Sequence, residues 1–310
     1  MFSPLKSAVK AMLESLRRRR SASALKHAAP HFKRAELTAD LHKMGILPGD
    51  TVFIHASLKS LGYVEGGAAQ VIGALQDAVG THGTLLIPSY YMPGGSILGT
   101  CKLAGYVFDP RRHGTHMGRL PEAFLAGGAI ERSLHPTHSV AAWGRHAAFL
   151  THGHHLAPSV FGQGSPWQRL LEIEHAKVLG LGISMGPVTF YHLLEDSMGD
   201  AFPVPVWQSE IHHLPCRDGN GKIWQVPVRP FDMVIAERRI DHPPRSDLRA
   251  YFGAEFERAG LRVNGRVGNA DSWWIPAQGF FQHLRKLAGE NITIYSSAQQ
   301  LAARPIKPER

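Results

Sequence analysis

At residues 51–62 the chain reads TVFIHASLKSLG, an apolar run followed by a polar loop that ends at a glycine. The apolar part, Thr51 to His55, predicts a buried β-strand. A glycine pair, Gly66-Gly67, then precedes a helical segment from Ala68 to Val79, and Thr84 to Pro88 predicts a second buried strand. A strand end, a polar loop and a helix N-terminus in this order resemble the phosphate-binding edge of an α/β sheet.

The alternation of strands and helices continues along the chain. Further strands are predicted at residues 140–144 and 177–182, and further helices at residues 37–45, 121–125, 165–171, 187–196, 248–259 and 277–287. Two extended runs on either side of Asp218-Gly219-Asn220-Gly221 predict a β-hairpin within residues 203–232. We therefore expect an α/β fold with a mixed, largely parallel central sheet flanked by helices and an inserted β-hairpin subdomain in the C-terminal half.

Charge is distributed unevenly over the 310 residues. The formal net charge is +9, which favours anionic partners, and much of the excess lies in residues 1–34. This segment is predicted to be a basic N-terminal extension containing an amphipathic helix that can contact an acidic surface. The catalytic domain is expected to span residues 35–292, and residues 293–310 are expected to form a C-terminal tail. A nucleic-acid-binding or membrane-surface protein that uses the basic segment stays as an alternative, although no nucleic acid partner is expected.

The two cysteines, Cys101 and Cys216, form neither a disulfide framework nor a metal-type spacing. We therefore expect no metal and a reducing compartment. The sequence has no apolar run of the length that crosses a bilayer, so a cytoplasmic location is predicted.

Two separate stretches carry residues suited to proton transfer. His192 and Glu195 lie three positions apart in a predicted helix, so the carboxylate can fix the imidazole tautomer and make it a general base. The stretch His135-Pro136-Thr137-His138-Ser139 precedes a strand, where His138 and Ser139 can orient a reacting group. The adjacent pairs His154-His155 and His212-His213 are expected in solvated loops.

A serine hydrolase is a second alternative, because Gly182-Ile183-Ser184-Met185-Gly186 matches a nucleophile elbow and follows a predicted strand. In this interpretation Ser184 is the nucleophile. The acid would come from Asp196 or Asp200 and the histidine from His212 or His213, at unusually short sequence separation.

The sequence resembles the aminoglycoside 3-N-acetyltransferase family over roughly residues 36 to 290. The residues that carry the resemblance are those at 55–62 (HASLKSLG), 66–67 (GG), 83–88 (GTLLIP), 108–110 (FDP), 117–118 (MG), 135–144 (HPTHSVAAWG), 161–166 (FGQGSP), 192–195 (HLLE) and 265–268 (GRVG). The histidine-centred string at 135–144 is the most specific of these.

The resemblance implies an acyl-CoA-dependent N-acetyltransferase that moves an acetyl or other acyl group from coenzyme A to an amine of an amino sugar. It implies that His192, oriented by Glu195, removes the amine proton without a covalent acyl-enzyme. The catalytic set that it implies is His192, Glu195 and His138. The coenzyme-binding set is His55, Ala56, Ser57, Leu58, Lys59, Ser60 and Ser139, and the acceptor-binding set is Tyr90, Asp109 and Thr189. Assembly as a homodimer is left open.

One departure from the family pattern bears on the acceptor. Aminoglycoside-modifying members usually carry an acidic residue and an asparagine six and four positions before the catalytic histidine, where this chain has Gly186 and Val188 and keeps only Thr189. An aminoglycoside is polycationic and favours a carboxylate-lined cleft. A neutral or anionic amino sugar is therefore the expected acceptor.

Overall fold

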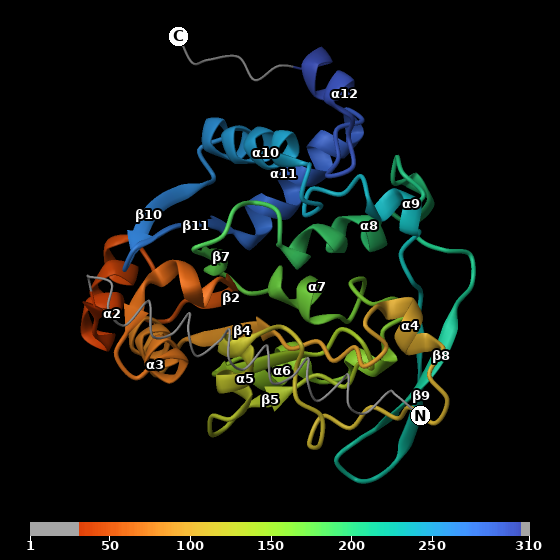
Figure 1. Cartoon of the computed structure of the whole chain (residues 1–310), viewed down its shortest axis with the longest axis horizontal. Coiled ribbons are helices and arrows are strands. Elements are labelled where there is room, and N and C mark those ends of the chain that lie inside the picture. The colour runs from red at the N-terminus through yellow and green to blue at the C-terminus, as the bar shows by residue number, and fades with distance from the viewer. Residues whose placement is uncertain (1–30, 305–310) are drawn as a thin grey trace, which may run out of the picture.

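A seven-stranded mixed sheet forms the centre of the molecule in the computed structural model, which describes residues 31–304. The strand order is β10-β11-β7-β2-β4-β6-β5, and in Figure 1 the strands follow one another from β10 and β11 at the top to β5 at the bottom. The strands of this sheet are β2 (Thr51–Ala56), β4 (Thr84–Pro88), β5 (Glu131–Arg132), β6 (Val140–Gly144), β7 (Ala176–Leu181), β10 (Val263–Val267) and β11 (Ala270–Pro276).

Parallel pairing is confined to the middle of this sheet. Strand β2 pairs in parallel with β4 and β7, whereas β6, β5, β11 and β10 are added on the two sides by antiparallel pairing. The predicted mixed α/β fold is confirmed, and its parallel part is the three-stranded centre. A long connection, residues 89–139, joins β4 to β6, which lies next to β4 and runs antiparallel to it.

Alternation along the strands builds one core on each face of the sheet. On β2, Val52 and Ile54 point into one core and Phe53 points into the other, as period-two alternation requires. The first core is closed by helices α2 (Arg34–Lys43), α3 (Ala68–Val79) and α5 (Arg119–Leu125). The second is closed by α6 (Ala147–Thr151), α7 (Pro166–Leu170), α8 (His192–Met198), α10 (Ser246–Arg258) and α11 (Ala277–Gly289).

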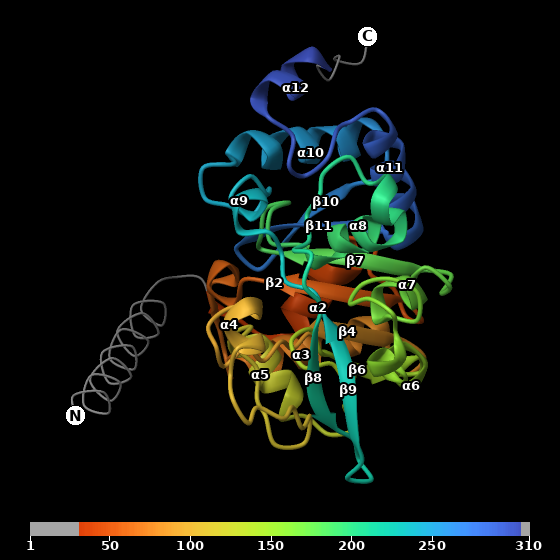
Figure 2. The same ribbon diagram turned by 90° about the vertical axis from the view of Figure 1, so that its right-hand side faces the viewer.

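The remaining elements lie outside these two layers. The predicted hairpin is confirmed as β8 (His212–Arg217) and β9 (Ile223–Val228), and Figure 2 shows it extending away from the sheet. It is held to the domain through a small core that contains Phe108 and Cys216. The other short elements are β1 (His31–Phe32), β3 (Tyr63–Val64), α4 (Ile97–Cys101), α9 (Met233–Ala236), α12 (Ala298–Ala303) and the 3-10 turns Leu58–Leu61, His154–Leu156, Thr189–Tyr191 and Gly199–Ala201.

Both ends of the described chain pack against the domain. Strand β1, which lies within the segment expected to be an extension, pairs with β3. Ile294 and Tyr295, which lie within the expected tail, are buried. The amphipathic helix expected near the N-terminus lies outside the described residues.

Local signals account for several helix starts. The helix predicted at 165–171 is α7: Ser165 caps it by accepting a hydrogen bond from the backbone amide of Gln168, and Pro166 occupies the first helical position. The predicted helix at 187–196 begins instead with a 3-10 turn over Thr189–Tyr191, and α8 continues it from His192. His192 therefore opens a regular α-helix directly after a 3-10 turn.

A glycine on β7 makes room for a tryptophan on β11. Gly180 lies opposite Trp273 in the antiparallel pair, and a Cβ atom added to Gly180 would lie 2.1 Å from Cε2 of the indole. The indole Nε1 donates a hydrogen bond of 2.9 Å to the carbonyl of Ile183. The small size of Gly180 therefore fixes Trp273 and, through it, the loop after β7.

We expect Gly180→Ala to lower the free energy of unfolding by about 1–3 kcal/mol, because overpacking a buried contact forces the ring and the strand apart. Urea denaturation followed by tryptophan fluorescence measures this change. Gly128→Ala is the matched control, since a Cβ atom there meets no heavy atom within 4 Å. Equal stability of the two variants would contradict the packing argument.

Candidate active site

The first turn of α8 and a distant tyrosine form a chain of hydrogen bonds. His192 Nδ1 lies 2.8 Å from Glu195 Oε2, and the hydroxyl of Tyr295 donates a hydrogen bond of 2.7 Å to Glu195 Oε1. Because the partner of Nδ1 is a carboxylate, Nδ1 carries the proton and Nε2 keeps its lone pair. Within residues 31–304, Nε2 makes no hydrogen bond. The arrangement is that of a base with a fixed tautomer and an open acceptor atom.

Tyr295 is the member of this chain that the sequence did not reveal. It is buried, and burial beside Glu195 raises the pKa of its hydroxyl well above the ordinary range, so it stays protonated and donates. It lies 100 positions from Glu195 in the sequence, within the expected C-terminal tail. No local pattern connects two residues at that separation, so only the tertiary structure brings them together.

His192 opens onto a cavity of about 260 Å³, here called the histidine pocket. Most of its wall is apolar. Its lining residues are Tyr90, Met92, Ile97, Met117, His138, Phe161, Gly186, Pro187, Val188, Thr189, Tyr191, His192, Phe231, Arg239, Ile240, Asp241 and Ile294. The pocket thus brings together four predicted site residues, Tyr90, His138, Thr189 and His192. By hydrogen-bond geometry, the buried hydroxyl of Tyr90 has no partner among the described residues.

The motif at 135–139 delivers His138 to this pocket. His135 Nδ1 accepts hydrogen bonds from the backbone amides of Thr137, at 3.3 Å, and His138, at 3.0 Å, and so shapes the turn. His138 Nδ1 lies 2.8 Å from Thr137 Oγ1. Burial lowers the pKa of His138 well below the ordinary value, so its imidazole is neutral at pH 7.

Ser139 and Asp109 are placed away from the pockets. Ser139 Oγ donates to the carbonyl of Ser89 at 2.8 Å and accepts from Arg132 Nε at 3.1 Å, inside the protein. Asp109 is buried in a turn, where its carboxylate accepts hydrogen bonds from the backbone and side chain of Arg111. The structure does not bring either residue to His192.

His154 corrects one expectation. It is fully buried rather than solvated: Nε2 donates to the carbonyl of Val160 at 2.9 Å and Nδ1 lies 3.0 Å from Ser133 Oγ. Its ring stacks on His135 with a centroid distance of 4.6 Å. His155 is half-buried against Trp224, and His212 and His213 lie on strand β8 rather than in a loop. A pair of adjacent histidines in the sequence does not indicate whether either ring is buried, because burial depends on how the rest of the chain packs around it.

His55 lines a second cavity, the middle pocket, of about 210 Å³. Its Nε2 accepts a hydrogen bond of 3.0 Å from the backbone amide of Thr189, so Nδ1 carries the proton. Nδ1 is buried and has no partner among the described residues. Burial lowers the pKa of His55 to about 3, so the ring is a neutral donor. The other lining residues are Ile54, Ala56, Ile87, Pro88, Met117, Leu120, Pro121, Ile183 and Pro187.

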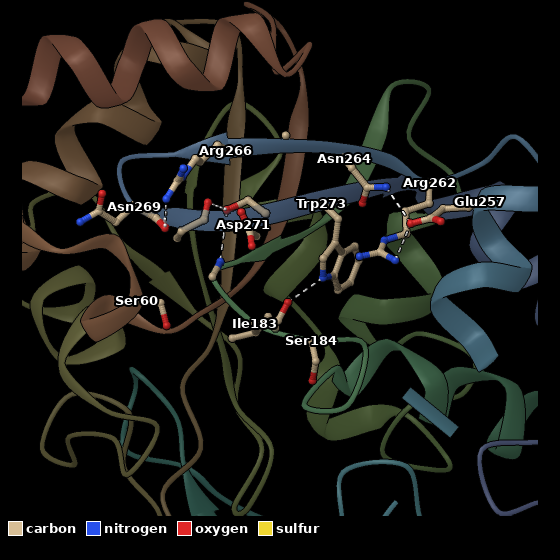
Figure 3. A pocket seen from close by; sticks show the side chains of 14 residues that line it. Ser60, Ile183, Ser184, Glu257, Arg262, Asn264, Arg266, Asn269, Asp271 and Trp273 are labelled. Atoms are coloured by element: carbon tan, nitrogen blue, oxygen red, sulfur yellow. Dashed lines mark hydrogen bonds and ion pairs between the residues drawn. The ribbon is translucent and has the colours of Figure 1, made fainter. Parts of the chain in front are cut away.

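A third and larger hollow, the outer pocket, has a volume of about 870 Å³ and is shown in Figure 3. Ser60 lines it from the loop after β2, and its hydroxyl donates to Ser57 Oγ at 2.9 Å. Arg262 is paired with Glu257, whereas Arg266 is exposed, and within the described residues its side chain bonds to the carbonyl of Asn269 alone. The remaining lining residues are Gly182, Ile183, Ser184, Asn264, Gly265, Ala270, Asp271, Ser272 and Trp273.

The three pockets are neighbours that share lining residues, and together they are here called the pocket path. Ile183 lines both the outer and the middle pocket, and Met117 and Pro187 line both the middle pocket and the histidine pocket. Of the predicted coenzyme-binding loop, Ala56 lies in the middle pocket and Ser60 in the outer pocket, while Ser57, Leu58 and Lys59 lie between them in sequence.

The serine hydrolase alternative is not supported. Ser184 is exposed, and its Oγ accepts a hydrogen bond of 3.3 Å from the backbone amide of Gly186. Asp196 accepts from the backbone amide of Phe161 at 2.7 Å, and His212 lies on the hairpin, so no triad forms among the described residues. Residues 31–304 also contain no cluster of three or more His, Cys, Asp or Glu arranged to hold a metal ion, and no helix among them could cross a membrane.

Several known proteins are similar to this chain in sequence and in fold. The family model for aminoglycoside 3-N-acetyltransferase matches residues 53–288. Aminoglycoside N(3)-acetyltransferase III of Serratia marcescens is 33% identical over 255 residues, which cover 78% of this chain and 91% of that protein. The crystal structure of the aminoglycoside acetyltransferase AAC(3)-Xa matches with a TM-score of 0.72 and 28% identity, covering 89% of this chain and 99% of the other. AAC-IIIb in a binary complex with CoASH matches with a TM-score of 0.71 and 25% identity, covering 86% of this chain and all of the other.

The family match spans the pocket path and the His192–Glu195 pair. The chain belongs to the aminoglycoside 3-N-acetyltransferase family, whose fold and acetyl-CoA-dependent N-acetyltransferase chemistry agree with this site.

Proposed function

We propose that the protein transfers an acetyl group from acetyl-CoA to the amine of an amino sugar other than an aminoglycoside, with His192 as the general base. The observation that carries this proposal is the unpartnered Nε2 of His192, held open to the histidine pocket by the buried Glu195–Tyr295 pair. The serine hydrolase and the nucleic-acid or membrane-surface alternatives have no comparable support.

The proposed step is direct attack by the acceptor amine. As the new C–N bond forms, the amine loses a proton to His192 Nε2, and Glu195 stabilises the imidazolium that results. The thioester supplies an activated acyl carbon with a thiolate leaving group, which takes up a proton as it departs. Because an amine attacks a thioester directly when both are positioned, no nucleophilic side chain is required.

The pocket path suits the shape of acetyl-CoA. Arg266 and the loop ending at Ser60 would hold the charged nucleotide end in the outer pocket, and the narrower middle pocket would hold the pantetheine arm. The buried, protonated Nδ1 of His55 lacks a partner in the described chain and would donate to an amide carbonyl of that arm. The binding of CoASH by the related AAC-IIIb supports this assignment.

The acceptor preference is proposed from the charge of the histidine pocket. Gly186 and Val188 line it where carboxylate and amide side chains would help bind a polycation, and Asp241 is the one carboxylate among its lining residues. Asp241 is already paired with Arg239. The pocket thus offers little free negative charge to an aminoglycoside. A cytoplasmic location belongs to this proposal.

We expect His192→Ala to reduce kcat/KM by about 10²–10⁴, the usual contribution of a positioned base. Thiol release from acetyl-CoA in the presence of a panel of amino sugars and aminoglycosides measures this loss. His213→Ala, an exposed histidine on β8, is the control. Near-normal turnover by the His192 variant would show that the base is assigned wrongly. Acetylation of kanamycin by the unmodified protein at roughly 1 per second or faster would refute the acceptor preference.

Tyr295→Phe removes one hydrogen bond from the buried carboxylate of Glu195. We expect kcat to fall about ten-fold, because a hydrogen bond to a buried charged group contributes about 1.5–3 kcal/mol, while KM for both substrates stays within about two-fold. Steady-state kinetics separates the two effects. The control is Tyr251→Phe, whose hydroxyl bonds to the carbonyl of Arg304 at 3.2 Å. A change in KM alone would argue against a positioning role for Tyr295.

Arg266→Gln is expected to raise KM for acetyl-CoA about five-fold and to leave kcat unchanged, since it removes one exposed positive charge from the proposed nucleotide end. The difference should shrink as ionic strength rises. Initial rates at low and high salt measure both effects. Arg285→Gln, an exposed residue of α11 outside the pockets, is the control. An identical effect of the two substitutions would place the coenzyme elsewhere.

A further inference from the structure

We propose that Arg239 makes the histidine pocket select an amine acceptor that also carries an anionic group, such as a phosphate or carboxylate. This inference rests on the proposed function and names the substrate class of the same site. Arg239 and Asp241 both line the pocket, joined by hydrogen bonds of 2.6 Å from Nε to Oδ1 and 2.8 Å from Nη2 to Oδ2. The Arg239 side chain keeps 20% of its surface exposed.

Arg239 differs from the neighbouring arginines in how its donors are used. Arg245 forms the same two bonds to Asp247, and its other donors bond to the carbonyls of Arg238 and Ser296. Arg249 bonds to three backbone carbonyls. Within residues 31–304, the Nη1 atom of Arg239 has no hydrogen-bond partner. Two N–H groups of a lining guanidinium therefore remain for a ligand.

The position of Arg239 relative to the base suits a single sugar. Both groups contact the ring of Phe231, whose centroid lies 4.8 Å from that of the His192 ring and 5.0 Å from the Arg239 guanidinium carbon. An acceptor whose amine reaches His192 Nε2 can thus present a nearby substituent to Arg239. A planar guanidinium with free donors recognises phosphate or carboxylate oxygens by charge-assisted hydrogen bonds.

The same pair disfavours a polycation. Burial acts to raise the pKa of Asp241, but the hydrogen bonds from Arg239 and the positive charge of its guanidinium together lower it below the ordinary value. This carboxylate is therefore ionised, and its charge is balanced inside the pocket. A second ammonium group on the acceptor would find no uncompensated carboxylate and would face the guanidinium. An anionic substituent gains from the guanidinium without displacing Asp241.

The test compares three amines that differ in charge: glucosamine, glucosamine 6-phosphate and kanamycin. Thiol release from acetyl-CoA gives kcat/KM, and calorimetric titration gives affinity independently of turnover. We expect the phosphate to improve affinity and kcat/KM about ten-fold over glucosamine in the unmodified protein, and Arg239→Gln to remove this ratio between the two amines. The double variant Arg239→Gln and Asp241→Asn avoids an unpaired buried carboxylate and should show the same loss.

Arg34→Gln is the matched control, because Arg34 forms a bidentate pair with Asp77 on the surface between α2 and α3. It should keep the full preference for the phosphate. Equal affinities of the protein for glucosamine and glucosamine 6-phosphate, or an advantage that survives in both Arg239 variants, would overturn the assignment. Failure of the proposed function would give a different result. None of the three amines would then cause thiol release, while the titration would still show a preference for the anionic amine that Arg239→Gln abolishes.

Discussion

A buried carboxylate with both oxygens bonded determines how the C-terminal part of this molecule is arranged. Glu195 is almost fully buried, and leaving an ionised carboxylate there without partners would cost several kcal/mol. Its two oxygens are satisfied by His192 from the same helix and by Tyr295 from the segment after α11. For the bond from Tyr295 to form, the segment after α11 must pack against α8, and Tyr295 is accordingly buried. The stability of the fold and the orientation of the base thus depend on the same carboxylate.

The parallel centre of the sheet brings together the loop proposed to bind the coenzyme and the helix that carries His192. Strands β2 and β7 run in register, with His55 opposite Gly180 and Ala56 opposite Leu181, so the loops that follow them leave the same edge of the sheet. The first loop carries Ser60, and the second carries Ile183 and continues to Thr189. The hydrogen bond from the Thr189 amide to His55 ties the second loop to the end of β2, three residues before His192.

Much of this arrangement follows from local sequence, and the rest depends on contacts between distant residues. The buried strand at 51–55, the helix at 68–79, the cap at Ser165 and the hairpin are encoded within short windows, and the structure confirms them. The three-residue spacing of His192 and Glu195 likewise sufficed to predict their hydrogen bond. Nothing local distinguishes an antiparallel β6 from a parallel one, and nothing local indicates the burial of His154. The sequence also did not predict the roles of Arg239, Asp241 and Tyr295. These residues come close to α8 only because later segments of the chain fold back against it.

The most recognisable motif is not the part to which we assign proton removal. In the stretch at 135–139, His135 accepts two backbone amides and His138 contacts a threonine, so both rings serve as neutral hydrogen-bonding groups. Burial lowers the pKa of His55 to about 3 and that of His154 to about 4, and it lowers the pKa values of His135 and His138 as well. Four buried imidazoles near the site are thereby kept uncharged, which avoids the cost of several buried cations. His192 differs from these four histidines because its partner is a carboxylate, Glu195, which can stabilise an added proton. We therefore assign the acceptance of the amine proton to His192.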